Sequence, residues 1–79
     1  MSPAQAELLR QLIVAEQAYW IASSQGKPVS NDDRGVEVSK ANGHSWSTAR
    51  VLQEAGLIDT VDVGNGMTLA FLGKYLPET

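Results

Sequence analysis

The sequence predicts a small α+β domain in which helices precede a C-terminal β-hairpin. Apolar residues recur at helical spacing along an N-terminal segment that follows Ser2-Pro3. A later helical segment ends at Gly56. Residues 57–72 then alternate between apolar and polar side chains on either side of Gly64-Asn65-Gly66. Elements that each have one apolar face close a single small core when they pack together.

Length and composition limit the kinds of protein that this chain can form. The chain has 79 residues, which predicts one domain over residues 1–79 with a free energy of unfolding on the order of 4–12 kcal/mol. It has no cysteine and one histidine, so we expect no disulfide, no metal site and no cofactor. No apolar run is long enough to span a membrane, and no secretory signal precedes the first helix. A cytoplasmic protein is therefore expected.

The first helix is expected over residues 3–23. Ser2 supplies a capping hydroxyl, Pro3 suits the first helical position, and Gln5 completes the spacing of a capping box. Turn-forming residues 23–26 predict its end. Its periodic apolar residues are Leu8, Leu9, Leu12, Ile13, Tyr19 and Trp20. Because two adjacent aromatic residues cannot both face one core, Tyr19 and Trp20 are interpreted either as core residues or as a dimer or partner surface.

Residues 27–42 carry signals for both helix and strand. Residues 27–30 are expected to be extended, because the residue before Pro28 avoids the helical region, and a short strand there is left open. A second helix is expected, with residues 36–42 as its safest part. Gly35 weakens this helix, however, and Val36-Glu37-Val38 also alternates like a short strand.

The third helix has clear signals at both ends. Ser45 or Ser47 is expected to cap its start, and it is expected to run to about residue 55. Gly56 occupies the position after the C-cap. Leu57 is then placed to contact Leu52, as in a Schellman motif.

The hairpin register follows from the apolar alternation. A two-residue turn would pair polar with apolar residues on one face, whereas a three-residue loop with a left-handed Gly66 leaves one face apolar. The predicted pairs are Val63 with Met67, Val61 with Leu69, and Asp62 with Thr68.

The middle of the chain resembles a known family. Residues 38–52 resemble a helix-turn-helix in the small Ser39, in Gly43 four residues later, in the Ser-x-Ser-Thr opening at 45–48, and in the apolar Ala49 and Leu52. Residues 53–58 then resemble the passage from helix end to strand in winged-helix regulators of bacterial or phage type. The resemblance covers roughly residues 28–72 and implies three helices with the hairpin as the wing. Two departures are His44, at a turn position usually filled by an aliphatic residue, and a short third helix.

The resemblance also implies a function, namely double-stranded DNA binding by a transcription regulator or by an accessory factor of a phage or mobile element. Helical spacing turns Trp46, Ser47, Arg50 and Val51 outward, and the family uses this face to contact DNA. Arg50 suits guanine or phosphate, and the nearby hydroxyls suit phosphate. The candidate DNA-binding residues are Lys40, His44, Ser45, Trp46, Ser47, Thr48, Arg50 and Asn65.

Charge supports a competing hypothesis, a protein-interaction module of the same shape. The net charge is −3, whereas DNA-binding surfaces need clustered cations. An exposed Trp46 is typical of a protein interface, and the polar face of the wing carries Asp62. An enzyme is not expected, because residues 43–47 lack the closing glycine of a nucleophile elbow and the only histidine adjoins its serine.

Overall fold

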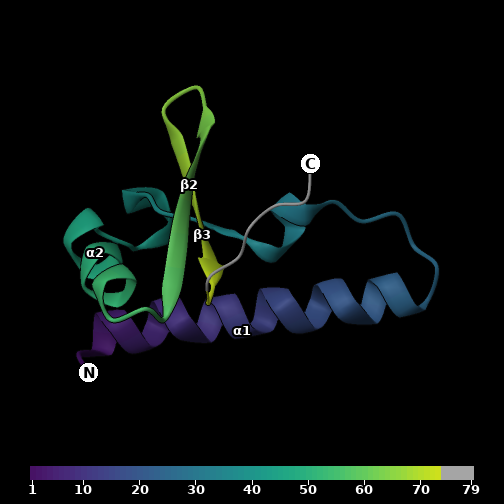
Figure 1. Ribbon diagram of the computed structural model, residues 1–79, viewed down its shortest axis with the longest axis horizontal. Helices are drawn as coiled ribbons and strands as arrows, with labels where there is room; N and C mark the ends of the chain where they lie inside the picture. Colours follow the sequence, from purple (N-terminus) through teal and green to yellow (C-terminus); the bar gives the residue numbers. More distant parts are fainter. Residues whose placement is uncertain (74–79) are drawn as a thin grey trace.

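The computed structural model describes residues 1–73, which form two α-helices and a three-stranded antiparallel sheet (Figure 1). The long helix α1 lies along one side of the molecule, and the sheet and the shorter helix α2 pack on it. The α+β class is therefore confirmed, whereas the expected three helices are wrong. None of the helices in residues 1–73 is both long and apolar enough to cross a membrane.

Helix α1 (Pro3–Ser24) begins and ends where local chemistry predicts. The Ser2 hydroxyl accepts a hydrogen bond from the Gln5 amide at 3.2 Å, and the Gln5 side chain accepts one from the Ser2 amide, so the capping box is complete. At the other end, the amides of Gly26 and Lys27 donate to the carbonyls of Ser23 and Ala22. This is a Schellman ending, with Gly26 left-handed at φ 75°.

The second predicted helix, at residues 36–42, is wrong. Its first part is strand β1 (Val36–Glu37), which pairs with β3, and its last part is a single 3-10 turn, η2 (Lys40–Asn42). Another 3-10 turn, η1 (Asn31–Arg34), precedes the strand. Residues 27–30 form no strand, so the one strand in this part of the chain lies later than expected.

Gly35 explains why a helix fails at this point. A Cβ built on Gly35 would lie 3.0 Å from the ring of Phe71 and 3.3 Å from the Ala70 carbonyl oxygen, so a side chain here would require β3 or the Phe71 ring to shift by a few tenths of an ångström. The β-branched Val36 and Val38 then follow in the extended form that such residues prefer. Pairing with a distant strand thus prevails over local helical propensity.

Helix α2 (Trp46–Glu54) has the predicted boundaries. Ser45, not Ser47, is the N-cap, because its hydroxyl accepts from the Thr48 amide at 3.2 Å. The amides of Gly56 and Leu57 donate to the carbonyls of Gln53 and Leu52 at 3.0 Å each. The predicted Schellman ending is therefore present.

Strands β2 (Ile58–Gly64) and β3 (Met67–Leu72) form the hairpin, and β1 lies on the other side of β3. The predicted pairs of Val61 with Leu69 and of Asp62 with Thr68 are confirmed. One core holds these elements together, with Leu8 and Leu12 from α1 against buried residues of α2 and the sheet. The other core residues are Val38, Ala49, Leu52, Ile58 and Ala70.

The turn of the hairpin differs from the prediction. Gly64, not Val63, lies opposite Met67, so Val63 is the additional residue of a β-bulge. The turn itself has two residues, Asn65 and Gly66, with φ of 55° and 72°. These left-handed angles are those of a type I′ turn, whose twist suits a hairpin. Because the bulge accommodates Val63 as an additional residue, a two-residue turn is compatible with the predicted pairing of Asp62 with Thr68 and of Val61 with Leu69.

Candidate nucleic-acid interface

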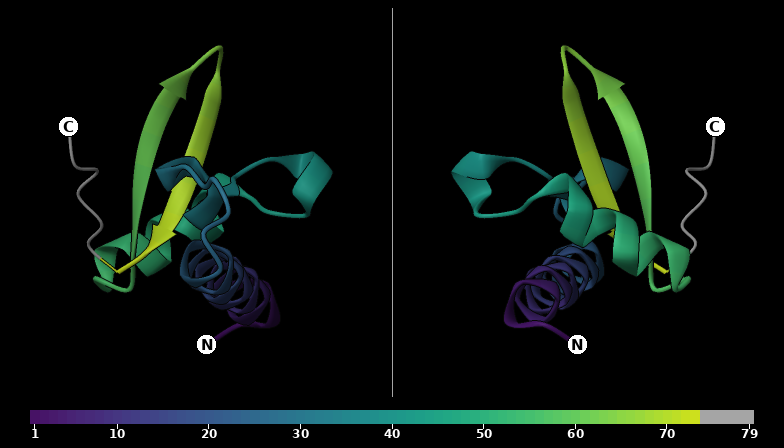
Figure 2. Two further views of the ribbon diagram at one scale, coloured as in Figure 1. Left: turned by 90° about the vertical axis from the view of Figure 1, so that its right-hand side faces the viewer. Right: turned by 90° about the vertical axis from the view of Figure 1, so that its left-hand side faces the viewer.

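Residues 38–52, expected as a helix-turn-helix, contain the 3-10 turn η2 and the single helix α2, whose outer face is exposed. Ala49 and Leu52 are buried in the core, which turns Ser47, Arg50 and Val51 toward solvent. Trp46, in the first turn, is 54% exposed. Figure 2 shows that α2 lies at the side of the molecule, with no other element of residues 1–73 drawn over its outer face. The predicted orientation of this helix is therefore present in the fold.

Three hydroxyl groups gather at the start of α2. The Ser45 oxygen lies 3.1 Å from the Ser47 hydroxyl and 2.9 Å from that of Thr48, and it also caps the Thr48 amide. Ser45 and Ser47 are exposed, whereas Thr48 is half-buried. This arrangement can present hydroxyl donors to an anion beside a helix N-terminus, where the helix dipole favours negative charge.

The lysine and arginine side chains of residues 1–73 fall into two groups. Arg10 and Arg34 each form an ion pair with a carboxylate of α1, Glu7 and Glu16 respectively, whereas Lys27, beyond the end of α1, is exposed and forms no ion pair within residues 1–73. Lys40, on the exposed turn η2, and Arg50, on α2, form no ion pair with any residue in 1–73. The positive charge that remains for an external anion on these elements therefore belongs to Lys40 and Arg50.

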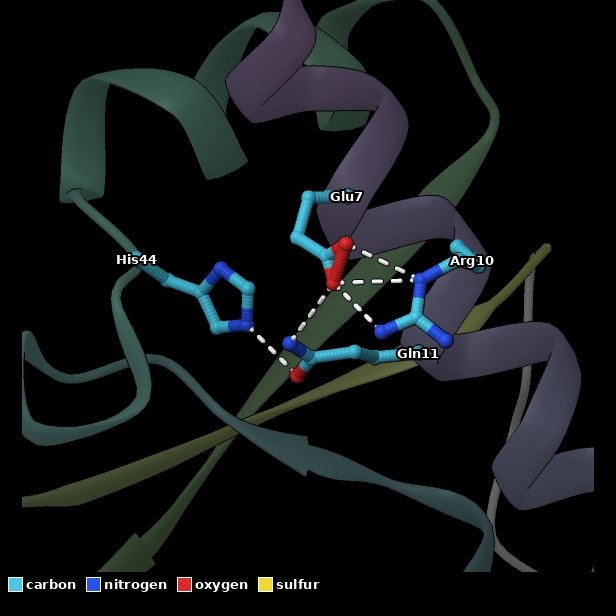
Figure 3. A network of polar contacts seen from close by, with 4 residues as sticks. All are labelled: Glu7, Arg10, Gln11 and His44. Carbon is cyan, nitrogen blue, oxygen red and sulfur yellow. Dashed lines mark hydrogen bonds and ion pairs between the residues drawn. The ribbon is translucent and has the colours of Figure 1, made fainter.

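His44 does not belong to this exposed face. Only 4% of the residue is accessible, and its Nε2 atom lies 2.8 Å from the Gln11 side-chain oxygen (Figure 3). The Gln11 amide in turn donates to Glu7, which is paired with Arg10. The expectation that His44 assists DNA binding is thereby corrected, because the ring joins the turn before α2 to helix α1.

Glu7 has a strongly shifted pKa. Hydrogen bonds from the Arg10 guanidinium and, second, from the Gln11 amide stabilise the carboxylate and lower its pKa from 4.5 to about 2. Arg10 approaches it with Nε at 2.9 Å and Nη2 at 2.6 Å from its two oxygens. Glu7 therefore stays ionised well into the acidic range.

We expect this shift to appear in a titration. The Glu7 carboxyl should titrate near pH 2 in the native protein, and its pKa should rise toward 4.5 in Arg10→Ala. Because the folded-state pKa is lowered, the stabilisation is complete above about pH 4.5 and is lost as the pH falls toward 2. Carboxyl ¹³C shifts followed against pH provide the measurement. Equal pKa values in the two proteins would contradict the assignment.

Asn65 lies apart from the other candidates. It is exposed at the tip of the hairpin, which projects away from α1, whereas α2 lies beside the base of the hairpin (Figure 2). The tip also exposes Val63 and Met67. The fold thus groups Ser45 with the candidates on α2, whereas Lys40 lies on the turn η2, which projects from the body before α2 begins, and Asn65 lies at the hairpin tip (Figure 2).

Tyr19 and Trp20 form a cluster with two residues that the sequence analysis missed. Their rings meet edge to face at 5.0 Å, and the Arg34 guanidinium carbon lies 5.3 Å and 5.4 Å from the two ring centroids. Glu16 accepts from both Trp20 Nε1 and Arg34 Nε. The i,i+4 spacing of Glu16 and Trp20 is a signal that sequence could have supplied, whereas Arg34 is too distant in the chain.

Comparisons of the chain with family models, with curated proteins and with solved structures found no match. Within residues 1–73, no group of three or more His, Asp or Glu side chains is placed to hold a metal ion. The groups exposed at the outer face of α2 are the guanidinium of Arg50, the hydroxyl of Ser47 and the indole ring of Trp46.

Proposed function

We propose that this chain is a winged-helix domain that binds double-stranded DNA through the outer face of α2. The observation that carries the proposal is that Arg50, on the exposed face of α2, and Lys40, on the turn before it, form no ion pair within residues 1–73, whereas Arg10 and Arg34 are paired. Lys27 is exposed and unpaired as well, but it lies beyond the end of α1. The order of elements supports it as well, since a tight turn, an exposed helix and a hairpin follow one another along the chain.

The geometry suits a helix placed in the major groove. Arg50 extends from the middle of α2, where a guanidinium can form two hydrogen bonds to guanine or hold a phosphate. Lys40, on the turn before α2, suits a backbone phosphate, and so do the hydroxyls around Ser45. The proposed role is that of a small cytoplasmic transcription regulator or an accessory factor of a phage or mobile element.

Substitution of the two exposed cations should weaken DNA binding. We expect Arg50→Ala to raise the dissociation constant about 10-fold, which corresponds to about 1.4 kcal/mol, within the range for a bidentate base contact. Lys40→Ala should lower the slope of log K against log salt by about 1, because one phosphate contact is lost. Fluorescence anisotropy with a labelled random duplex at low salt measures both effects.

Lys27→Ala is the matched control, because it removes an exposed cation beyond the end of α1, away from α2. It should change neither the affinity nor the salt slope by a comparable amount. The proposal is contradicted if micromolar protein gives no anisotropy change at low salt, or if all three variants weaken binding equally.

A second candidate function is the docking of a protein partner on the same face. It is favoured by one observation, the joint exposure of Trp46 and Val51 on the helix that carries Arg50, in a chain whose net charge is −3. In that case Trp46→Ala should remove partner binding with little dependence on salt. The duplex titration separates the two functions, because only the first requires a steep salt dependence.

A further inference from the structure

The solvent face of α1 carries large apolar side chains that are about half exposed. Leu8 and Leu12 are the fully buried residues of this helix, and both lie in its first half. On the opposite face, the four residues Ile13, Val14, Trp20 and Ile21 are 46% to 58% exposed. Gln17 and Ala18, which lie between them along the helix, are exposed too. We call these six residues the α1 stripe.

The stripe occupies the central and C-terminal part of a long helix. At 1.5 Å per residue, residues 13–21 cover about 12 Å of the roughly 33 Å of α1. In Figure 1 the side of α1 turned away from the sheet is covered by no element of residues 1–73. An apolar face of this size along one helix is typical of a surface that packs against a partner.

Trp20 is held in place before any partner arrives. Its indole N–H donates to Glu16 at 2.8 Å, its ring meets Tyr19, and Arg34 lies 5.4 Å from its centroid. The exposed part of the indole therefore has a fixed orientation. A side chain that is already ordered loses little conformational entropy on association, which favours binding.

The stripe has a two-fold pattern that indicates what covers it. Reading outward from Gln17, Ile13 and Ile21 stand four positions away on the two sides, and Val14 and Trp20 stand three positions away. A two-fold axis at Gln17 therefore places Ile13 of one copy against Ile21 of another, and Val14 against Trp20. Self-complementarity of this kind is the requirement for an isologous dimer interface.

One charged group is also placed favourably by this symmetry about Gln17. Arg10 and Ser24 stand seven positions away, which places a guanidinium near the C-terminal end of the partner helix, where the helix dipole favours a cation. A parallel pair would instead place like charges together.

We infer that the α1 stripe binds a second copy of this chain, in an antiparallel pair of α1 helices with the two-fold axis at Gln17. Because only four large apolar side chains of each copy would be covered, we expect a weak dimer with a dissociation constant on the order of micromolar. The inference concerns the protein alone and does not depend on DNA binding. The surface differs from the predicted pair of Tyr19 and Trp20, because Tyr19 is half-buried beneath Arg34.

Sedimentation equilibrium of the full chain tests the inference without DNA. The mass should rise from 8.5 kDa at low concentration toward twice that value at high micromolar concentration. Ile21→Glu should leave the protein monomeric with an unchanged far-ultraviolet circular dichroism spectrum, since Ile21 is 58% exposed. A wild-type chain that stays monomeric throughout overturns the inference, and so does a dimer that Ile21→Glu leaves intact.

Mixed variants test the antiparallel register. Ile13→Glu and Ile21→Lys should each be monomeric, and their mixture should form a heterodimer in which the new Glu faces the new Lys. The matched control mixes Ile13→Glu with Ile13→Lys, which pair only in a parallel arrangement and should stay monomeric. Association in the control mixture but not in the first would overturn the proposed register.

A single introduced cysteine provides an independent measurement, because the chain contains none. Gln17→Cys should form a disulfide-linked dimer under mild oxidation, since the two-fold axis brings residue 17 of both copies together. Ser24→Cys, exposed on the same face seven positions away, should cross-link much more slowly. Equal rates for the two variants would place the axis elsewhere and contradict the assignment.

Discussion

Leu12→Ala should lower the free energy of unfolding by about 3 kcal/mol, the middle of the range for deletion of a fully buried leucine side chain. Leu12 is completely inaccessible and belongs to the core cluster that joins α1 to α2 and the sheet. Truncation removes apolar contacts and leaves a cavity that the surrounding elements fill only in part. The free energy of unfolding of the whole domain is expected to be about 4–12 kcal/mol. The substitution would therefore remove a large part of its stability.

Urea unfolding followed by circular dichroism measures this effect. The matched control is Ile13→Ala, the next residue of the same helix, which loses a similar volume from a half-exposed position. Its effect should be below about 1 kcal/mol when measured at concentrations where the copies do not associate. Similar losses for the two variants would show that both faces of α1 are packed within one chain, which would also remove the basis of the α1 stripe.

Leu12 is buried and Ile13 is half-exposed, a difference that the sequence alone could not predict. Periodicity grouped Ile13 with Leu8 and Leu12, because both faces of the helix are apolar in its central part. Which face meets the core depends on the sheet and α2, elements far away in the chain. Helix ends were predictable because capping is local: Ser2, Ser45 and Gly56 act on atoms within a few residues.

The prediction of a second helix was wrong because this segment also depends on a distant element. Val36 pairs with Ala70, and Gly35 is pressed against Phe71, so the conformation of this segment is set by a strand more than thirty residues away. In the candidate site, the outer face of α2 followed from helical spacing. The burial of His44 did not, because its partner Gln11 lies on α1.

Arg34→Met should lower the free energy of unfolding by about 2–3 kcal/mol, the second large effect that we expect. The Arg34 and Glu16 side chains are only 18% and 15% exposed, and their closest atoms lie 2.7 Å apart. The substitution leaves a largely buried carboxylate without its cation and also removes the guanidinium from the faces of Tyr19 and Trp20. Arg10→Met is the control: its ion pair with Glu7 is exposed, so little change in stability is expected.

A double-mutant cycle with Glu16→Gln separates charge from packing. If the ion pair dominates, the two single substitutions should be strongly coupled, with about 1–2 kcal/mol of the loss shared between them. If Arg34 acts chiefly by packing on the two rings, the losses should add, and the assignment of a stabilising ion pair would be wrong. The cycle also bears on self-association, because Glu16 and Arg34 hold the indole of Trp20 in the α1 stripe. Arg34→Met should therefore weaken the dimer although Arg34 lies outside the stripe, as expected if the ordered indole contributes to binding.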